Sequence, residues 1–328
     1  MNLKGIWGLG LLLVFISGLI WRLGADSGPE AAERPDQAEP DTIASGPPFA
    51  VQVKDLVVPY SVMALFVLPD EEVEFEAVLQ RTDSLSFEAD DGRLVDSSAD
   101  AWTWRAPNEP GLYPVVIRSA LGVVRFHVFV QHPFLNREAV FRGYRVGAYQ
   151  SEPLRGNARF LRPEGFVEVN NHTAPVKVSP SFTLGDFQSH QPGDPKYLAL
   201  DERLLLKLEA ILEAWNADGR EAETFTVMSA FRTPWYNASI GNTTRYSLHL
   251  YGRAADIFID EDGDGRMDDL NRNGREDTGD ARILYDFIDA MKEEAWYAPF
   301  VGGLGLYAPK PHRGPFVHVD VRGFEARW

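Results

Sequence analysis

The sequence predicts an α+β protein in which an antiparallel-sheet domain follows a small all-β sandwich. Residues 49–133 are short runs that alternate apolar and polar side chains, separated by turn clusters such as ADDGR and NEPG. Residues 134–177 scatter Gly, Pro and Arg among aromatics and predict an irregular connector. From residue 178 to 328, helical and strand periods are mixed without a regular strand–helix–strand rhythm, which favours an antiparallel sheet.

The N-terminus contains an apolar run of sixteen residues, Ile6 to Trp21, flanked by basic residues. That length exceeds most signal-peptide cores and falls short of the ~20 residues of a full membrane span. We expect residues 1–23 to be an uncleaved signal anchor, with a removed signal peptide as the alternative. Both put the remainder outside the cytoplasm. Residues 24–48 are rich in Pro, Ala and acids and predict a disordered linker.

Charge and cysteine content exclude several classes of protein. The 328 residues carry a formal charge of −16 and include no cysteine. Residues 26–41 hold six acids against one arginine, and residues 260–280 hold nine acids against three arginines. No basic stripe exists to release counterions, so we expect no nucleic-acid partner. Without cysteine, a transition-metal site has to use carboxylates and the seven histidines.

Two helices and four strands are predicted after residue 200. Residues 201–219 place six apolar side chains on one helical face, with Asp201 as N-cap and Gly219 as the stop. The six are Leu204, Leu205, Leu208, Ile211, Leu212 and Trp215. Residues 224–229 predict a strand and residues 281–296 a second amphipathic helix. The segments FVGGLGLY and FVHVDV predict a closing pair of strands.

Two of these strands carry metal-ligand residues on the face opposite the core. In ADIFID the alternation turns the isoleucines inward and presents Asp256 on the open face. In FVHVDV the valines point inward, and His318 and Asp320 point outward. His249 lies in the turn before the first strand, where Gly252 permits a tight bend. Two histidines and one carboxylate leave a fourth zinc position for water, as in catalytic sites.

Five of these residues form the pattern S-x-H-x-x-G-x-A-x-D: Ser247, His249, Gly252, Ala254 and Asp256. With the downstream HVD, the pattern resembles the zinc D-alanyl-D-alanine carboxypeptidase and dipeptidase superfamily, which includes cell-wall peptidases and the hedgehog signalling domain. SPSFTLGDF, KYLAL, SAFRT and GGLGLY…FVHVDV look closer to the periplasmic murein endopeptidases. The resemblance covers about residues 178–328. Separately, WTWRAPNEPGLYPVVI resembles bacterial immunoglobulin-like modules at the level of the fold.

The resemblance implies that His249, Asp256 and His318 bind one catalytic zinc ion. It implies a peptidase that cleaves peptidoglycan stem peptides or cross-links in the periplasm, anchored to the inner membrane by the N-terminal segment. It makes Arg232, within SAFRT, a residue that contacts substrate or the polarised carbonyl, with a salt bridge to a neighbouring acid as the alternative. Ser247 either orients a ligand or caps the turn.

The catalytic base departs from the family pattern. Many relatives carry an acid three residues before the last histidine, and this chain has Pro315 there. Asp320 either takes the proton from zinc-bound water or only accepts an N–H bond from a ligand. His312, in PKPHRG, is the other candidate, as base or as transition-state donor. The missing acid keeps alternatives open: a non-catalytic, zinc-containing wall-binding or signalling module, or a protein whose functional part is the sandwich.

The segment DEDGDGRMDDLNRNGREDTGD, residues 260–280, predicts a second metal site. Its oxygens fall in two overlapping EF-hand-like registers, neither with the bidentate Glu at position twelve. The ligand candidates are Asp260, Asp262, Asp264, Asp268, Asp269, Asn271, Asn273, Asp277 and Asp280. The overlap is similar to thrombospondin-type or dockerin-type loops. We expect one or two structural calcium ions, with a solvated acidic loop as the alternative.

Overall fold

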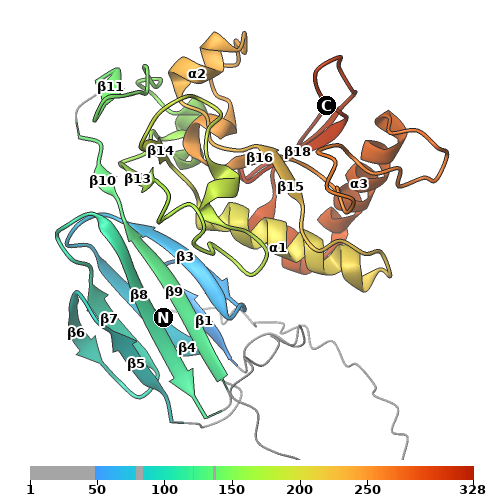
Figure 1. Cartoon of the computed structure of the whole chain (residues 1–328). Helices are drawn as coiled ribbons and strands as arrows, with labels where there is room; N and C mark the ends of the chain where they lie inside the picture. Colours follow the sequence, from blue (N-terminus) through green and yellow to red (C-terminus); the bar gives the residue numbers. More distant parts are fainter. Residues whose placement is uncertain (1–48, 79–83, 121, 136–137) are drawn as a thin grey trace, which may run out of the picture. The chain divides into compact units, whose positions relative to one another are not determined.

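The structure is a computed structural model of the chain. The described ranges are 49–78, 84–120, 122–135 and 138–328. The predicted anchor and linker, residues 1–23 and 24–48, lie outside them. The predicted α+β class is confirmed, with many strands and few helices (Figure 1). No helix in these ranges is long and apolar enough to cross a membrane.

The strands that follow residue 49 form two sheets that share one core. The first has the order β2-β1-β4-β7-β6. Its strands are β1 (Ala50–Val53), β2 (Leu56–Val58), β4 (Glu72–Val78), β6 (Arg93–Ser97) and β7 (Ala101–Arg105). The second, in the order β3-β9-β8-β5, comprises β3 (Val62–Val67), β5 (Ser86–Ala89), β8 (Gly111–Ser119) and β9 (Gly122–Val130). Phe75 of the first sheet packs on Phe126 of the second, with ring centroids 5.2 Å apart. All strand pairs in these two sheets are antiparallel except β3 with β9, which is parallel. Alternation of apolar and polar residues does not indicate the direction in which two strands pair.

The segment expected to be an irregular connector contains short strands. A hairpin pairs β11 (Val140–Phe141) with β12 (Tyr144–Arg145). Strand β13 (Gly165–Val169) pairs with β10 (His132–Pro133) and with β14 (Lys196–Leu198). The two pairings of β13 join residues that are far apart in the chain.

An ion pair from the first sheet and a backbone hydrogen bond from the second connect the sandwich to the first helix of the C-terminal region. Lys54 lies 2.6 Å from Glu202, and the same carboxylate accepts the backbone N–H of Phe66 at 3.0 Å. The apolar core is continuous through both regions.

The helices largely follow the sequence pattern. Helix α1 (Glu202–Ala217) is capped by Asp201, which accepts the N–H of Arg203, and all six predicted core residues are buried. Helix α2 (Pro234–Ser239) is short. Helix α3 (Thr278–Ala290) starts three residues before the predicted boundary, because an aspartate capping box begins it, and 3-10 turns follow it up to residue 300.

The C-terminal sheet has the order β15-β16-β18-β17-β19. Its strands are β15 (Thr226–Ser229), β16 (Ala254–Phe258), β17 (Gly303–Tyr307), β18 (Phe316–Asp320) and β19 (Ala326–Arg327). The predicted closing pair, β17 with β18, is present and antiparallel. Only β17 with β19 is parallel.

Candidate metal centre

Strand pairing brings two of the predicted ligands side by side. Asp256 on β16 lies directly opposite His318 on β18, so both side chains point to the same face. His249 comes from the 3-10 turn before β16. That turn ends at Gly252, whose φ is +67°, and a Cβ there would lie 2.1 Å from a facing backbone carbonyl oxygen. Glycine is therefore required at the bend that sets the position of His249.

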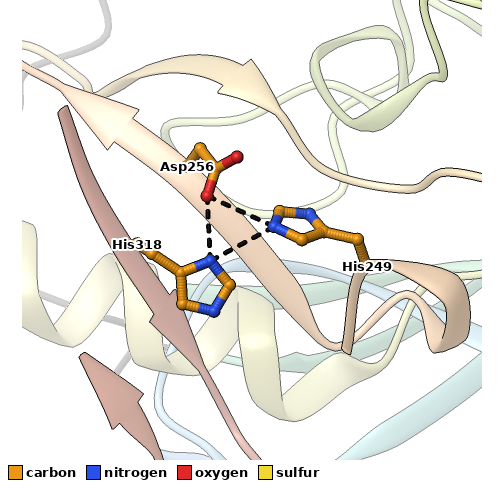
Figure 2. Close-up of side chains that lie close together, drawn as sticks. All are labelled: His249, Asp256 and His318. Carbon is orange, nitrogen blue, oxygen red and sulfur yellow. Dashed lines mark hydrogen bonds and ion pairs between the residues drawn. The ribbon is translucent and has the colours of Figure 1, made fainter. Parts of the chain in front are cut away.

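The three ligating atoms form a nearly equilateral triangle (Figure 2). Nε2 of His249 is 3.2 Å from both Nδ1 of His318 and Oδ1 of Asp256, and the last two atoms are 2.9 Å apart. Zinc bonds of about 2.0–2.1 Å in tetrahedral geometry separate ligand atoms by about 3.3–3.4 Å. The triangle needs to expand only slightly to hold such an ion.

Hydrogen bonds behind the two imidazoles leave the ligating nitrogens unprotonated. Nδ1 of His249 donates to the carbonyl oxygen of Ala230 at 2.6 Å, because a carbonyl can only accept. Nε2 of His318 donates to Oδ2 of Asp320 at 3.1 Å. The lone pairs of the opposite nitrogens then point at the shared position. Partners of this kind fix the tautomer and orientation of metal-binding histidines.

The charges of the site also favour a cation. Burial lowers the pKa of His249, which keeps it neutral. Burial acts in the same direction on His318, but its bonds to Asp256 and Asp320 outweigh burial and raise its pKa. Burial alone would raise the pKa of Asp256, yet the two histidines hold that pKa well below its usual range. As the pH falls, His318 takes up a second proton, on Nδ1; a metal ion has to displace that proton, so metal affinity should fall with falling pH.

Arg232 occupies the second oxygen of the ligand carboxylate. Its Nη2 is 2.5 Å from Oδ2 of Asp256, and its Nε donates to Oγ of Ser229 at 2.7 Å. The salt bridge considered for Arg232 is therefore present. Arg232 also lines the cleft that contains the triad, and a residue that contacts substrate has to lie there.

Asp320 does not lie on an open face, and that prediction is wrong. All five residues of β18 are buried, and Asp320 is 0% exposed. Its Oδ1 accepts the backbone N–H groups of Gly303 and Arg322, while Oδ2 accepts from His318 and the Arg322 guanidinium. Burial would raise its pKa, but these bonds hold it far below the usual range. Strand alternation assigns a side chain to a face and cannot tell whether that face is covered. The geometry favours the second role considered for Asp320, orientation of a ligand histidine.

Two further predicted residues lie at the cleft without contacting the triad. His312 is exposed at the tip of the loop between β17 and β18. Ser247 starts the 3-10 turn without a side-chain capping bond. In the described part of the chain its hydroxyl forms no hydrogen bond to any of the three ligands. Neither the ligand-orienting role nor the capping role expected of Ser247 is therefore supported by a hydrogen bond. Pro315 is buried before β18.

A cleft of about 980 Å³ contains the triad, and its wall includes a residue that the sequence did not suggest. The Trp328 ring packs on the His318 imidazole, with centroids 5.2 Å apart, and its indole N–H donates to the Tyr307 hydroxyl at 2.7 Å. Gly305, opposite His318 in the sheet, makes room, since a Cβ there would lie 2.4 Å from the indole nitrogen. A glycine inside a strand often marks a place where another group approaches the backbone closely, so Gly305 was the sequence feature that could have indicated this contact.

The acidic segment forms two loops with the same backbone design, nine residues apart. Asp260 accepts the N–H of Gly265 at 3.0 Å, and Asp269 accepts the N–H of Gly274 at 2.6 Å. The fourth and sixth residues of each loop have positive φ. The two overlapping registers of the sequence thus correspond to a local structural repeat.

The first loop suits a cation better than the second. Carboxylate oxygens of Asp260, Asp262 and Asp268 lie within 4.8 Å of one another, and Oδ1 of Asp260 is buried without a hydrogen-bond partner. Burial and then the neighbouring aspartates, including Asp264, raise the pKa of Asp268.

In the second loop, both oxygens of Asp280 already accept backbone N–H groups, from Asn271 and Asp277, as part of the α3 capping box. The backbone N–H of Asn273 in turn bonds to Asp269 and to the Asn271 side chain.

No protein-family model matches the chain, and no curated protein matches its sequence.

Proposed function

We propose that this chain is a zinc-dependent peptidase that hydrolyses peptide bonds in peptidoglycan. The observation that carries the proposal is the convergence of two imidazole nitrogens and one carboxylate oxygen, all within 3.2 Å, at a large cleft. Three protein ligands of this kind leave a position for water. The peptidoglycan substrate and the periplasmic location come from the resemblance to murein peptidases. The same proposal includes an immunoglobulin-like sandwich over residues 49–133 and a peptidase domain over residues 178–328.

The roles of the protein groups follow from their contacts. When bound, zinc polarises the scissile carbonyl and lowers the pKa of its water toward ~7. The Ala230 carbonyl and Asp320 orient the two histidines, and Arg232 orients Asp256. The Arg232 guanidinium also steadies negative charge that develops in the cleft. We assign the proton-accepting role to His312, because the ligand Asp256 is the sole carboxylate among the described residues that line the cleft, and the ring of His190, which also lines it, is bonded through Nε2 to the Met228 carbonyl oxygen.

Defined murein fragments test the proposal. We expect the purified protein to create new peptide termini, detected by mass spectrometry, and to lose this activity to a chelator and to His249→Ala. His172→Ala is the matched control, because His172 is exposed and does not line the cleft. Full activity in His318→Ala would refute the proposal.

The scarcity of carboxylates in the cleft favours one alternative function. A non-catalytic zinc-containing module for wall binding or signalling needs the ligands and no general base. Zinc-dependent wall binding without new peptide termini would support it.

We also propose one structural calcium ion in the loop from Asp260 to Asp268. The unpartnered Oδ1 of Asp260 and the crowded carboxylates around it support this site. Calcium prefers six to eight such oxygens. The loop leads from β16, which carries Asp256, toward α3, and a backbone atom of Met267 lies 3.7 Å from the Cβ position of Gly314. An ordered loop would therefore support both the metal-ligand strand and the base of the β17–β18 loop.

A further inference from the structure

The cleft is positively charged, although the whole chain carries −16. In the described lining, Asp256 is accompanied by four permanently cationic side chains: Arg232, Lys310, Arg313 and Arg322. Arg232 is paired with Asp256, and Arg322 is paired with Asp320. These two charges are already compensated within the protein.

The other two cations have no carboxylate partner among the described residues. Nη1 of Arg313 donates to the carbonyl oxygens of Ala308 and Gly314, at 3.0 and 3.2 Å, and its guanidinium forms no ion pair with a described carboxylate. Lys310 is exposed, and its ammonium group has no hydrogen-bond or ion-pair partner in the described part of the chain. Both side chains line the cleft that contains the triad, so together they form a position that suits an anionic group of a ligand.

The loop that carries these cations is rigid. The backbone N–H of Lys310 donates to the Arg313 carbonyl at 2.9 Å, and the reverse bond measures 3.1 Å. Three prolines, at positions 309, 311 and 315, restrict the rest of the loop. The Arg313 guanidinium lies 4.5 Å over the ring of Phe316, which itself stacks on Tyr307. The cation is therefore held in place before any ligand arrives, which lowers the entropy lost on binding.

We propose that Lys310 and Arg313 bind a carboxylate group of the peptide substrate beside the bond that is cleaved at His249, Asp256 and His318. The peptide nature of the ligand rests on the proposed function, whereas its negative charge follows from the two unpaired cations. A carboxylate completes the hydrogen bonds of an arginine bidentately and offsets the cost of its partial burial. The carboxylate belongs either to the C-terminal residue of the peptide or to a side chain, and the two sources can be separated.

Three synthetic stem peptides test this inference. One has both the C-terminal and the glutamyl carboxylate free, the second has a C-terminal amide, and the third has an amide at the glutamyl residue. For each peptide kcat/KM is measured on the zinc-loaded full chain; a peptide that is not cleaved is titrated calorimetrically against the same protein. We expect one of the two amides to lower kcat/KM, or to raise Kd, by about tenfold, the size of one partly exposed charged bond. The sensitive position identifies the source of the carboxylate.

The variants separate this role from a structural one. Arg313→Met should remove the preference for the acid, Arg313→Lys should restore part of it, and Lys310→Met should reduce it. Arg245→Met should keep it, because Arg245 is exposed and does not line the cleft. Equal values for acid and both amides in the wild-type chain would overturn the inference, and so would an undiminished preference in the Lys310→Met, Arg313→Met double variant. A preference that depends on Arg313 in a chain without hydrolysis would support the inference and refute the proposed peptidase.

Discussion

Asp320→Asn separates a positioning role for this residue from a role as catalytic base. In the wild-type chain both oxygens accept: Oδ1 from two backbone N–H groups, and Oδ2 from His318 at 3.1 Å. Asparagine has one accepting oxygen. When that oxygen stays with the N–H groups of Gly303 and Arg322, the amide N–H₂ faces Nε2 of His318.

The amide then donates to Nε2, and the proton of His318 moves to Nδ1, the nitrogen that faces the metal position. Loss of such a partner of a metal-binding histidine typically costs 10–100-fold in metal affinity. We therefore expect the zinc Kd to rise by about 10–100-fold, which corresponds to ~1.4–2.8 kcal/mol.

Competition with a chromophoric chelator measures the zinc Kd. Asp286→Asn, which alters an exposed aspartate on α3, is the matched control and should bind zinc as the wild-type chain does. Circular dichroism confirms that the variant is folded. Wild-type zinc affinity together with a lost kcat in Asp320→Asn would refute the positioning argument and restore Asp320 as the base.

Three other perturbations follow from the structure. Gly252→Ala forces alanine into a left-handed conformation and places its Cβ 2.1 Å from a backbone carbonyl oxygen. We expect the free energy of unfolding to fall by about 3 kcal/mol or more and the zinc affinity to weaken. A denaturation midpoint and a zinc Kd equal to those of the wild-type chain would contradict this. Burial lowers the pKa of Lys207 to about 7, against the opposing influence of Asp320. Because the unfolded chain holds this proton up to about pH 10.4, stability should rise from pH 7 toward pH 10 by at most ~1.4 kcal/mol per unit. In urea denaturation, the free energy of unfolding should rise less steeply with pH in Lys207→Met than in the wild-type chain. Equal slopes in the two chains would show that burial does not lower the pKa of Lys207. Calcium at a hundredfold excess over its Kd should stabilise the wild-type chain by about 2.7 kcal/mol, and it should not change the stability of Asp260→Asn. A wild-type melting temperature that does not change when calcium is added would exclude the site.

Sequence patterns predicted the features that depend on neighbouring residues. The apolar spacing and Asp201 cap of α1 are local, and so is the bend at Gly252 that presents His249. Alternation also predicted that Asp256 and His318 lie on the faces of their strands opposite the apolar residues. These features required no knowledge of what packs on them.

The remaining features depend on contacts between distant parts of the chain. Alternation placed Asp320 on a face, but only packing reveals that the face is covered and that both oxygens are used. The approach of Trp328 to His318 is likewise set by the pairing of β19 with β17. Which cations lack partners, as Lys310 and Arg313 do, is also decided by the whole fold. A sequence pattern cannot supply this information.

X-ray absorption at the zinc edge of the metal-loaded chain tests directly whether His249, Asp256 and His318 bind zinc. We expect one zinc ion with two imidazole nitrogens and oxygen ligands at about 2.0–2.2 Å, of which one is the Asp256 carboxylate and another is water. In His318→Ala the imidazole signal should fall to that of His249 alone, or be lost together with the bound ion. A spectrum of oxygen ligands alone, or one unchanged by that substitution, would contradict the assignment of His249, Asp256 and His318 as the metal centre.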